Sequence, residues 1–161
     1  MAITYLLLGS NQGDRLLFLT TAQKHITAQV GAITQKSAVY ETAAWGLENQ
    51  AAFLNQVLEV TTPLAPADLL TQINLIENEL GRERKIKWDA RVIDIDILYY
   101  DTIIMQTKDL TIPHPELPNR RFTLVPLTEI APNFRHPVFK KTNQTLLSGC
   151  PDKLEVQVFK G

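Results

Sequence analysis

The stretch Arg91-Val92-Ile93-Asp94-Ile95-Asp96-Ile97-Leu98-Tyr99-Tyr100 carries the pattern that decides the fold. Isoleucines at positions 93, 95 and 97 alternate with Asp94, Asp96 and Leu98, and this alternation with period two predicts a β-strand. Residues two apart in a strand point to the same face, about 6.6 Å apart along the chain. We therefore expect Asp94 and Asp96 to project together from one face, while the isoleucines enter a core on the other.

Two neighbouring carboxylates, those of Asp94 and Asp96, repel each other and are costly to remove from water. A bound cation removes both penalties, and oxygen-only ligands favour Mg²⁺, which usually keeps waters and takes substrate phosphates. An edge strand with two solvated acids explains the same pattern. A D-x-D pattern alone does not separate these two interpretations.

A basic segment immediately before this strand favours the metal interpretation. Residues 82–91, Arg82-Glu83-Arg84-Lys85-Ile86-Lys87-Trp88-Asp89-Ala90-Arg91, hold five cationic residues against two acidic ones, in a chain of net charge −1. A metal–polyphosphate ligand needs both signs of charge at once. The basic segment and the acidic strand together therefore indicate a site for such a ligand.

The composition is that of an ordinary globular protein, with 45% hydrophobic and 20% charged residues among 161, and predicts a single domain over residues 1–161. A net charge of −1 argues against a nucleic-acid or membrane-surface binder. Cys150 is the single cysteine, which excludes an internal disulfide and a cysteine metal cluster. The sequence has no apolar run of about 20 residues and no signal-peptide pattern, so we expect a cytoplasmic protein.

The remaining periodicity predicts an α+β fold with helices packed on an antiparallel sheet. The expected strands cover residues 3–8, 36–40 and 53–62, together with the Asp94–Asp96 strand in the stretch 91–100. The expected helices cover residues 16–30 and 63–80, with Gly81 as the stop. This order is β-α-β-β-α-β, the ferredoxin-like core. We expect additional C-terminal elements: a short strand at 103–104, a helix at 124–130 and a last strand at 154–159 in an otherwise irregular tail.

The turn Gly9-Ser10-Asn11-Gln12-Gly13-Asp14 follows the first expected strand. It lacks the G-x-x-x-x-G-K-[ST] and G-x-G-x-x-G patterns of phosphate-binding loops. Ser10, Asn11 or Asp14 can instead cap the helix that follows. Capping is therefore the role that we predict for this turn.

Several segments together resemble a known family: Leu8-Gly9-Ser10-Asn11, Tyr40-Glu41-Thr42, Phe53-Leu54-Asn55, Gly81-Arg82, Arg84, Arg91, Asp94-Ile95-Asp96-Ile97, Pro113-His114 and Asn119-Arg120-Arg121-Phe122. Their order and content are similar to those of the 6-hydroxymethyl-7,8-dihydropterin pyrophosphokinases, enzymes of folate biosynthesis. The resemblance covers nearly the whole chain. Any single segment would be a weak indication, whereas the combination is specific.

The resemblance implies an ATP-dependent diphosphotransferase that moves a pyrophosphoryl group from ATP to the hydroxymethyl group of a reduced pterin and releases AMP. Asp94 and Asp96 match the aspartates that hold two Mg²⁺ ions. The catalytic set implied in this way is Arg82, Arg91, Asp94 and Asp96. The expected partners are ATP and 6-hydroxymethyl-7,8-dihydropterin, with no nucleic acid and no membrane, and the resemblance implies a monomer.

The binding residues implied by the resemblance fall into two sets. The set for ATP is Asn74, Glu77, Arg84, Lys87, Trp88, Arg91, Ile97, Thr111, His114 and Arg120. The set for the pterin is Thr42, Ala43, Ala44, Trp45, Phe53, Asn55, Trp88 and Phe122. In the pterin set, Phe53 and Phe122 match the residues that sandwich the flat ring, and Asn55 offers an acceptor and donors to the edge of that ring.

Two other functions remain open at this point. A non-catalytic ferredoxin-like module that binds nucleotides or RNA fits the predicted topology, but the chain has no [KR]-G-[FY]-[GA]-F-V pattern and is not basic. A different magnesium-dependent nucleotidyl transferase would use the same acidic pair. Phe53, Phe122 and Asn55 argue modestly for the pyrophosphokinase over this second alternative.

Overall fold

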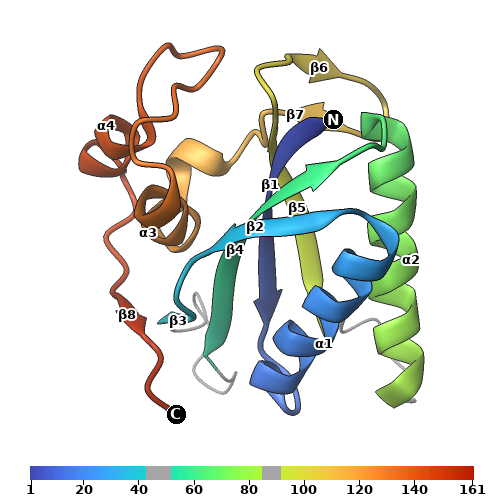
Figure 1. The fold of residues 1–161 in the computed structure, drawn as a ribbon. Helices are drawn as coiled ribbons and strands as arrows, with labels where there is room; N and C mark the ends of the chain where they lie inside the picture. The colour runs from blue at the N-terminus through green and yellow to red at the C-terminus, as the bar shows by residue number, and fades with distance from the viewer. Residues whose placement is uncertain (43–51, 85–91) are drawn as a thin grey trace.

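The computed structural model describes residues 1–42, 52–84 and 92–161, with residues 82–84 described by their backbone alone. The described strands form a six-stranded antiparallel sheet in the order β5-β1-β4-β3-β8, and β2 also pairs with β4 (Figure 1). These strands are β1 (Ala2–Ser10), β2 (Ala32–Lys36), β3 (Tyr40–Thr42), β4 (Phe53–Thr62), β5 (Asp94–Tyr100) and β8 (Val156–Val158).

Helices lie on both faces of this sheet. The long helices α1 (Arg15–Gln29) and α2 (Pro66–Arg84) lie along one face, and α3 (Arg121–Ile130) and α4 (Asn143–Ser148) lie on the other side (Figure 1). A small hairpin of β6 (Met105–Gln106) and β7 (Thr111–Ile112) and the 3-10 turn η1 (Leu117–Asn119) connect β5 to α3. The predicted α+β class is therefore confirmed, as is an antiparallel sheet packed against helices.

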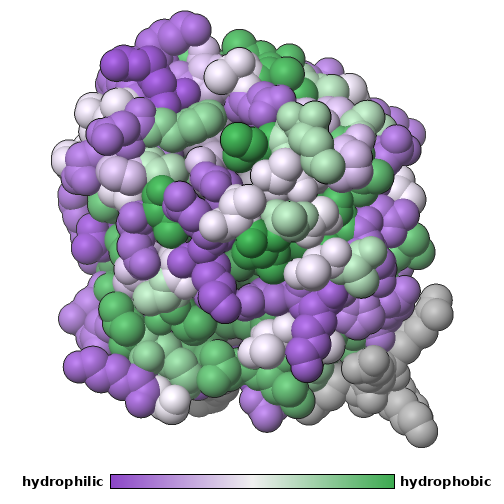
Figure 2. Space-filling view, in the orientation of Figure 1, coloured by the Kyte–Doolittle hydropathy of each residue, from purple (hydrophilic) through white to green (hydrophobic). Residues whose placement is uncertain are grey.

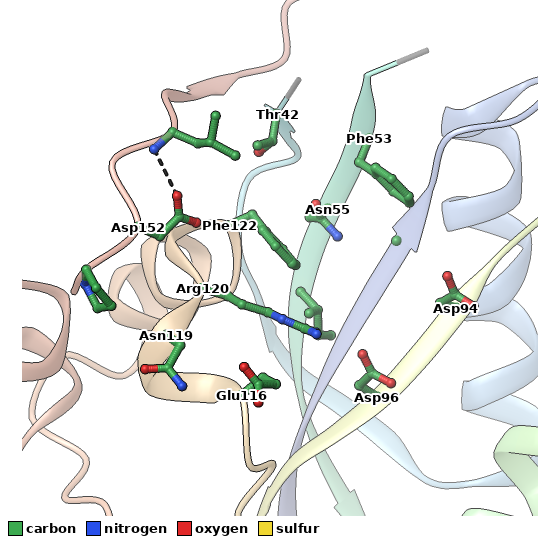
Figure 3. A pocket seen from close by; sticks show the side chains of 14 residues that line it. Thr42, Phe53, Asn55, Asp94, Asp96, Glu116, Asn119, Arg120, Phe122 and Asp152 are labelled. Carbon is green, nitrogen blue, oxygen red and sulfur yellow. Dashed lines mark hydrogen bonds between the residues drawn. The ribbon is translucent and has the colours of Figure 1, made fainter. Parts of the chain in front are cut away.

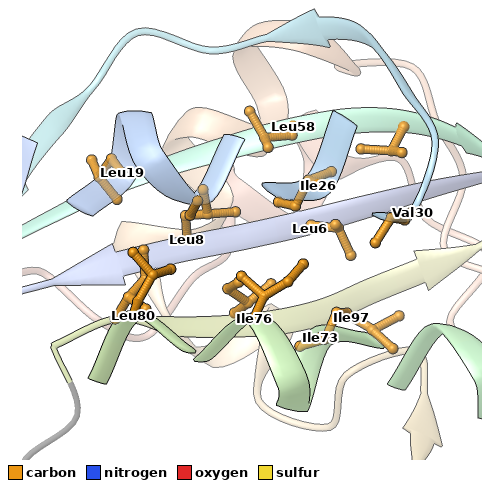
Figure 4. Packing of buried hydrophobic residues seen from close by; sticks show 14 of the residues in the cluster. Leu6, Leu8, Leu19, Ile26, Val30, Leu58, Ile73, Ile76, Leu80 and Ile97 are labelled. Atoms are coloured by element: carbon orange, nitrogen blue, oxygen red, sulfur yellow. The ribbon is translucent and has the colours of Figure 1, made fainter. Parts of the chain in front are cut away.

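Each face of the sheet has its own hydrophobic core. Leu6 and Leu8 of β1 are fully buried against α1 and α2 (Figure 4). Tyr5 and Leu7, the alternating residues of the same strand, pack in the second cluster with α3 and α4. Hydrophilic residues cover most of the face seen in Figure 2, with hydrophobic residues in small groups between them. Within the described ranges, no helix has the length and apolar character that a membrane crossing requires.

The edge strand β5 and the residue before it have the predicted arrangement. Ile93, Ile95 and Ile97 are each at most 5% exposed and lie in the core beneath α1 and α2. Asp94 and Asp96 are partly exposed on the opposite face. The order of β1, α1, β2, β4, α2 and β5 along the chain follows the predicted β-α-β-β-α-β pattern.

Several predicted boundaries are wrong. Helix α2 begins at Pro66 and not at residue 63, and helix α3 begins at Arg121 and not at residue 124. The second strand does not cover residues 36–40, because the pairing breaks at Ser37, whose hydroxyl accepts the Val57 N–H at 3.0 Å between β2 and β3. Helix α2 continues past Gly81 to Arg84, since one helical glycine costs only about 1 kcal/mol. The strand expected at 103–104 begins instead at Met105.

The C-terminal tail is more ordered than the sequence predicted. It contains α4, which begins after Thr142, whose side chain accepts the Thr145 N–H. Asn143 is fully buried; its Oδ1 accepts the Tyr99 hydroxyl at 2.7 Å, and its Nδ2 donates to the Ala131 carbonyl at 2.9 Å. These two hydrogen bonds attach the tail to β5 and to the end of α3.

Candidate active site

A cavity of about 630 Å³ lies on the sheet face that carries Asp94 and Asp96 (Figure 3). The ends of β1, β4 and β5, the start of α3 and part of the tail surround it. The lining residues are Leu7, Gly9, Thr42, Phe53, Asn55, Asp94, Asp96, Glu116, Asn119, Arg120, Phe122, Pro151, Asp152 and Leu154. Segments from the whole length of the chain therefore meet at one site.

Strand register explains why these side chains meet. Asp94 is paired with Gly9, and Gly9 is paired with Asn55, so these three residues form one row across β5, β1 and β4. Thr42 is paired with Phe53, two residues before Asn55 on β4. Directly paired residues, and residues two apart on one strand, share a face of the sheet. The carboxylates and the polar groups of Thr42 and Asn55 therefore line the same cavity.

The acidic end of the cavity offers two carboxylates on a supported edge strand. Glu77 of α2 accepts the backbone N–H of Ile95 at 2.8 Å, which ties the outer edge of β5 to the helix. In the part of the chain that the structure describes, no group of three or more His, Cys, Asp or Glu side chains is placed to hold a metal. A pair of carboxylates fits Mg²⁺, which completes its shell with waters and substrate phosphates.

His114 is oriented as a hydrogen-bond donor toward this end. Its Nδ1 accepts the Glu116 N–H at 3.1 Å, and its Nε2 lies 4.0 Å from Oδ2 of Asp96. An Nδ1 that accepts a hydrogen bond carries no proton, so the neutral ring carries its proton on Nε2. Burial lowers the pKa of His114 against the opposing effect of Asp96. The site thus presents a neutral N–H donor beside the carboxylates.

The other end of the cavity contains two polar atoms without partners. Among the described residues, neither the Oδ1 atom of Asn55 nor the Oγ1 atom of Thr42 has a hydrogen-bond partner. Both residues are only 4% exposed, and an unsatisfied buried polar group costs about 1–3 kcal/mol. The Nδ2 of Asn55 donates to the Leu8 carbonyl at 3.2 Å, which orients the amide. A ligand with N–H donors would satisfy the two oxygens.

Aromatic rings lie on either side of these polar groups. Phe53 from β4 and Phe122 from α3 both point into the cavity (Figure 3). The Cζ atom of Arg120 lies 5.7 Å from the centroid of the Phe122 ring. The arrangement suits a flat ring between the two aromatic side chains, with the guanidinium toward the acidic end.

Gly9 keeps room for the Asn55 amide, and we predict that Gly9→Ala weakens binding at the polar end. A Cβ atom at position 9 would lie 2.7 Å from Nδ2 of Asn55, so the amide would have to move. We expect about a tenfold rise in the KM for the flat-ring substrate. Gly149→Ala is the control, since its Cβ would meet the Thr145 carbonyl at an ordinary 3.7 Å. Equal KM values for the two variants would contradict this prediction.

Arg15 supports the polar end from the opposite face of the sheet. Its Nη1 donates to Oε2 of Glu41 at 2.9 Å and to the Ala52 carbonyl at 2.7 Å, and its Cζ lies 5.5 Å from the centroid of the Phe159 ring. Glu41 and Ala52 are the chain neighbours of Thr42 and Phe53, which form a pair. Arg15 therefore holds the end of the β3–β4 ladder that carries these two cavity residues.

We predict that Arg15→Met lowers the free energy of unfolding by about 1 kcal/mol and raises the KM for the flat-ring substrate. The methionine cannot donate to Glu41 or Ala52, and it removes the guanidinium that lies over the Phe159 ring. Thermal unfolding and initial rates measure the two effects. Arg135→Met removes an exposed arginine that donates to the Lys140 carbonyl at 2.7 Å. An unfolding midpoint no lower than that of this control would contradict the role given to Arg15.

The cavity brings together seven of the predicted site residues: Thr42, Phe53, Asn55, Asp94, Asp96, Arg120 and Phe122. Asn74 is exposed on α2, Thr111 is partly buried in β7, and the Ile97 side chain is buried on the opposite face of the sheet. The predicted residues Ala43, Ala44, Trp45, Lys87, Trp88 and Arg91 lie outside the described residues, and Arg82 and Arg84 are described by their backbone alone.

Seven other cavity residues were not predicted as site residues from the sequence: Leu7, Gly9, Glu116, Asn119, Pro151, Asp152 and Leu154. Asn119 belongs to the quoted Asn119-Arg120-Arg121-Phe122 segment, which could have indicated it. The three tail residues carry no periodic pattern and lie far along the chain from the other lining residues. Only the tertiary structure brings them to the site.

The paired carboxylates suit Mg²⁺ with bound phosphates, the nearby arginine suits phosphate oxygens, and the aromatic slot suits a flat ring, so the site fits an enzyme that transfers phosphate groups. Residues 5–132 match the family model for 7,8-dihydro-6-hydroxymethylpterin-pyrophosphokinase (HPPK). The chain belongs to this family.

Individual relatives agree with the family assignment. A 2-amino-4-hydroxy-6-hydroxymethyldihydropteridine pyrophosphokinase of Aquifex aeolicus is 47% identical over 141 residues, which cover 88% of each chain. The Bacillus subtilis protein of the same name is 45% identical over 130 residues, which cover 80% of this chain and 77% of the relative.

Solved structures show the same fold at lower identity. A Plasmodium falciparum HPPK-DHPS triple mutant superposes with a TM-score of 0.75 at 20% identity, over 92% of this chain. This chain spans 44% of that longer chain. The similarity therefore concerns the fold of one part of the HPPK-DHPS protein.

Proposed function

We propose that the protein transfers the pyrophosphoryl group of ATP to the hydroxymethyl group of 6-hydroxymethyl-7,8-dihydropterin, releasing AMP, as a step of folate biosynthesis. The observation that carries this proposal is the cavity itself. It joins the Asp94 and Asp96 carboxylates to the unpaired oxygens of Thr42 and Asn55. The acidic end suits a metal–triphosphate, and the other end suits the amide and amino edge of a pterin.

At the ATP end, Asp94 and Asp96 would hold two Mg²⁺ ions. When bound, these ions would neutralise phosphate charge and make the attacking hydroxyl more acidic. His114 donates from Nε2 to a phosphate oxygen, and Arg120 adds a charged fork of donors. Phosphoryl transfer depends mainly on such positioning and charge neutralisation. The cavity supplies both next to the pterin slot.

At the pterin end, the ring lies between Phe53 and Phe122. Offset stacking on two aromatic faces adds about 1 kcal/mol beyond the burial of apolar area. The Oδ1 of Asn55 and the Oγ1 of Thr42 accept N–H groups from the ring edge, which removes the penalty of their burial. The hydroxymethyl group then points toward the carboxylate end.

Other residues complete the proposal through the resemblance. Arg82 and Arg91 steady the triphosphate during transfer. Further ATP contacts come from Asn74, Glu77, Arg84, Lys87, Trp88, Ile97 and Thr111, with Ile97 restricted to backbone contact by its buried side chain. Further pterin contacts come from Ala43, Ala44, Trp45 and Trp88.

The test is AMP formation from ATP and Mg²⁺, measured with and without 6-hydroxymethyl-7,8-dihydropterin. We expect AMP only when the pterin is present. ADP in place of AMP, or a rate independent of the pterin, would overturn the proposal.

The non-catalytic RNA-binding module is not favoured, because the cavity carries two carboxylates that would repel a phosphate backbone without a metal. We propose a cytoplasmic monomer that does not bind nucleic acid. Light scattering measures the mass in solution, and fluorescence anisotropy with a labelled RNA measures nucleic-acid binding. A dimer mass or micromolar RNA affinity at 150 mM salt would contradict these parts of the proposal.

A further inference from the structure

Asp152 lies in the C-terminal tail, outside the residues 5–132 that match the family model, and yet it lines the cavity. Its side chain lies beside the start of α3, next to the cluster of Arg120 and Phe122 (Figure 3). The tail thus reaches the substrate site at the start of α3, where the proposed binding residues Arg120 and Phe122 are located.

The carboxylate of Asp152 caps this helix from a distance in sequence. Its Oδ2 accepts the backbone N–H of Arg121, the first residue of α3, at 3.0 Å across 31 positions in the chain. The residue that precedes the helix is Arg120, whose guanidinium has only donors and cannot accept a helix N–H. The tail therefore supplies the capping acceptor that the helix's own sequence does not.

The second oxygen of Asp152 orders the tail itself. Oδ1 accepts the Leu154 N–H at 2.9 Å (Figure 3). Two residues further on, the tail enters β8, where Val156 is paired with Thr42 of β3. One side chain thus connects the start of α3 to the strand that carries the polar end of the cavity.

The proposed roles of Arg120, just before α3, and of Phe122, in its first turn, both depend on this anchor. Phe122 stacks on the ring, and Arg120 reaches the phosphates, with its Cζ 5.7 Å from the Phe122 ring centroid. A shift of the helix start by about 1 Å would displace both side chains together, and a displacement of this size costs up to about 100-fold in rate. The negative charge also complements the positive end of the helix dipole.

We propose that Asp152 is a positioning residue for the transfer reaction. By capping α3 from the C-terminal tail of the same chain, it fixes Arg120 and Phe122 against the two substrates. This inference rests on the proposed function. It concerns a tail residue that acts through the hydrogen bonds of its carboxylate to the start of α3 and to the tail, and it predicts that the tail sets the geometry of the pterin slot.

The first test compares Asp152→Ala, Asp152→Asn and the exposed control Glu155→Ala. We expect Asp152→Ala to lose about 10- to 100-fold in kcat/KM for the pterin. Asp152→Asn keeps one acceptor oxygen and should recover part of this loss. Calorimetric titration of the pterin should show weaker binding for Asp152→Ala, at a temperature well below its unfolding midpoint. Glu155→Ala should match the unaltered protein.

The second test removes the donor of this hydrogen bond, the Arg121 N–H, and leaves the Asp152 acceptor unchanged. Arg121→Pro deletes the N–H, while proline fits the first position of a helix. Arg120 has φ −123° and ψ 112°, the extended conformation that a following proline requires. Arg121→Ala keeps the N–H and serves as the matched control. We expect Arg121→Pro to lose about tenfold in kcat/KM relative to Arg121→Ala, and Asp152→Ala to add little to it.

The outcomes separate this inference from the proposed function. An unaltered protein without pterin-dependent AMP formation would overturn the proposed function. An active unaltered protein, with Asp152→Ala within twofold of it in kcat/KM and in pterin affinity, would overturn the inference alone. If Asp152→Ala does not fold, the comparison of Arg121→Pro with Arg121→Ala decides. Equal kcat/KM values for these two variants would overturn the inference.

Discussion

Asp96→Ala abolishes pterin-dependent AMP formation, with an expected loss of at least about 1000-fold in kcat. Asp94 and Asp96 share one face of β5 and line the cavity, and a two-carboxylate site loses half of its protein ligands in this variant. Charge stabilisation by a bound metal is worth several kcal/mol, and each 1.36 kcal/mol is a factor of ten in rate. Initial rates over a range of Mg²⁺ concentrations measure the loss.

The same substitution should not destabilise the protein when Mg²⁺ is absent. Two adjacent carboxylates repel, so the removal of one should leave the unfolding midpoint unchanged or raise it. The control is Asp109→Ala, an exposed residue in the β6–β7 hairpin. A rate for Asp96→Ala within tenfold of this control would contradict the metal site.

Asn55→Leu loses about 100-fold in pterin affinity while the fold keeps its stability. The leucine has a similar volume, but it removes the Oδ1 atom that lacks a partner among the described residues. A ring N–H would then be buried without an acceptor, at a cost of about 1–3 kcal/mol. Calorimetric titration of the pterin measures the affinity.

The stability of the fold should not fall together with the pterin affinity at this position. Removal of an unsatisfied buried atom favours the folded state, although the 3.2 Å hydrogen bond from Nδ2 to the Leu8 carbonyl is also lost. The KM for ATP should stay within twofold, because Asn55 lies at the other end of the cavity. Asn133→Leu, at an exposed position, controls for added surface hydrophobicity. Equal losses for ATP and pterin would indicate a general distortion and contradict the role of Asn55.

The sequence predicted those parts of the fold that depend on local pattern. Alternation identified β5 and the direction of Asp94 and Asp96, and the predicted range of 53–62 matches β4. The break at Ser37 could not be predicted, because it depends on a hydrogen bond from the Val57 N–H, 20 residues away in sequence. Local propensity contains no information about such a partner.

The site was predictable to the extent that its residues belong to recognisable segments. The tail residues Pro151, Asp152 and Leu154 reach the cavity through long-range packing, which no periodic pattern encodes. The role of Gly9 depends on the 2.7 Å approach of the Asn55 amide to a Cβ at that position, and a sequence alone shows only a turn former. The unpaired oxygens of Thr42 and Asn55 likewise appear only in three dimensions.

The most direct test of the central claim is the identity of both products in one reaction. We would follow equimolar ATP and 6-hydroxymethyl-7,8-dihydropterin, with Mg²⁺ and the unaltered protein, by ³¹P NMR and mass spectrometry. We predict equal amounts of AMP and a pterin diphosphate ester. ADP with a pterin monophosphate, or free phosphate without a modified pterin, would contradict the transfer of an intact pyrophosphoryl group.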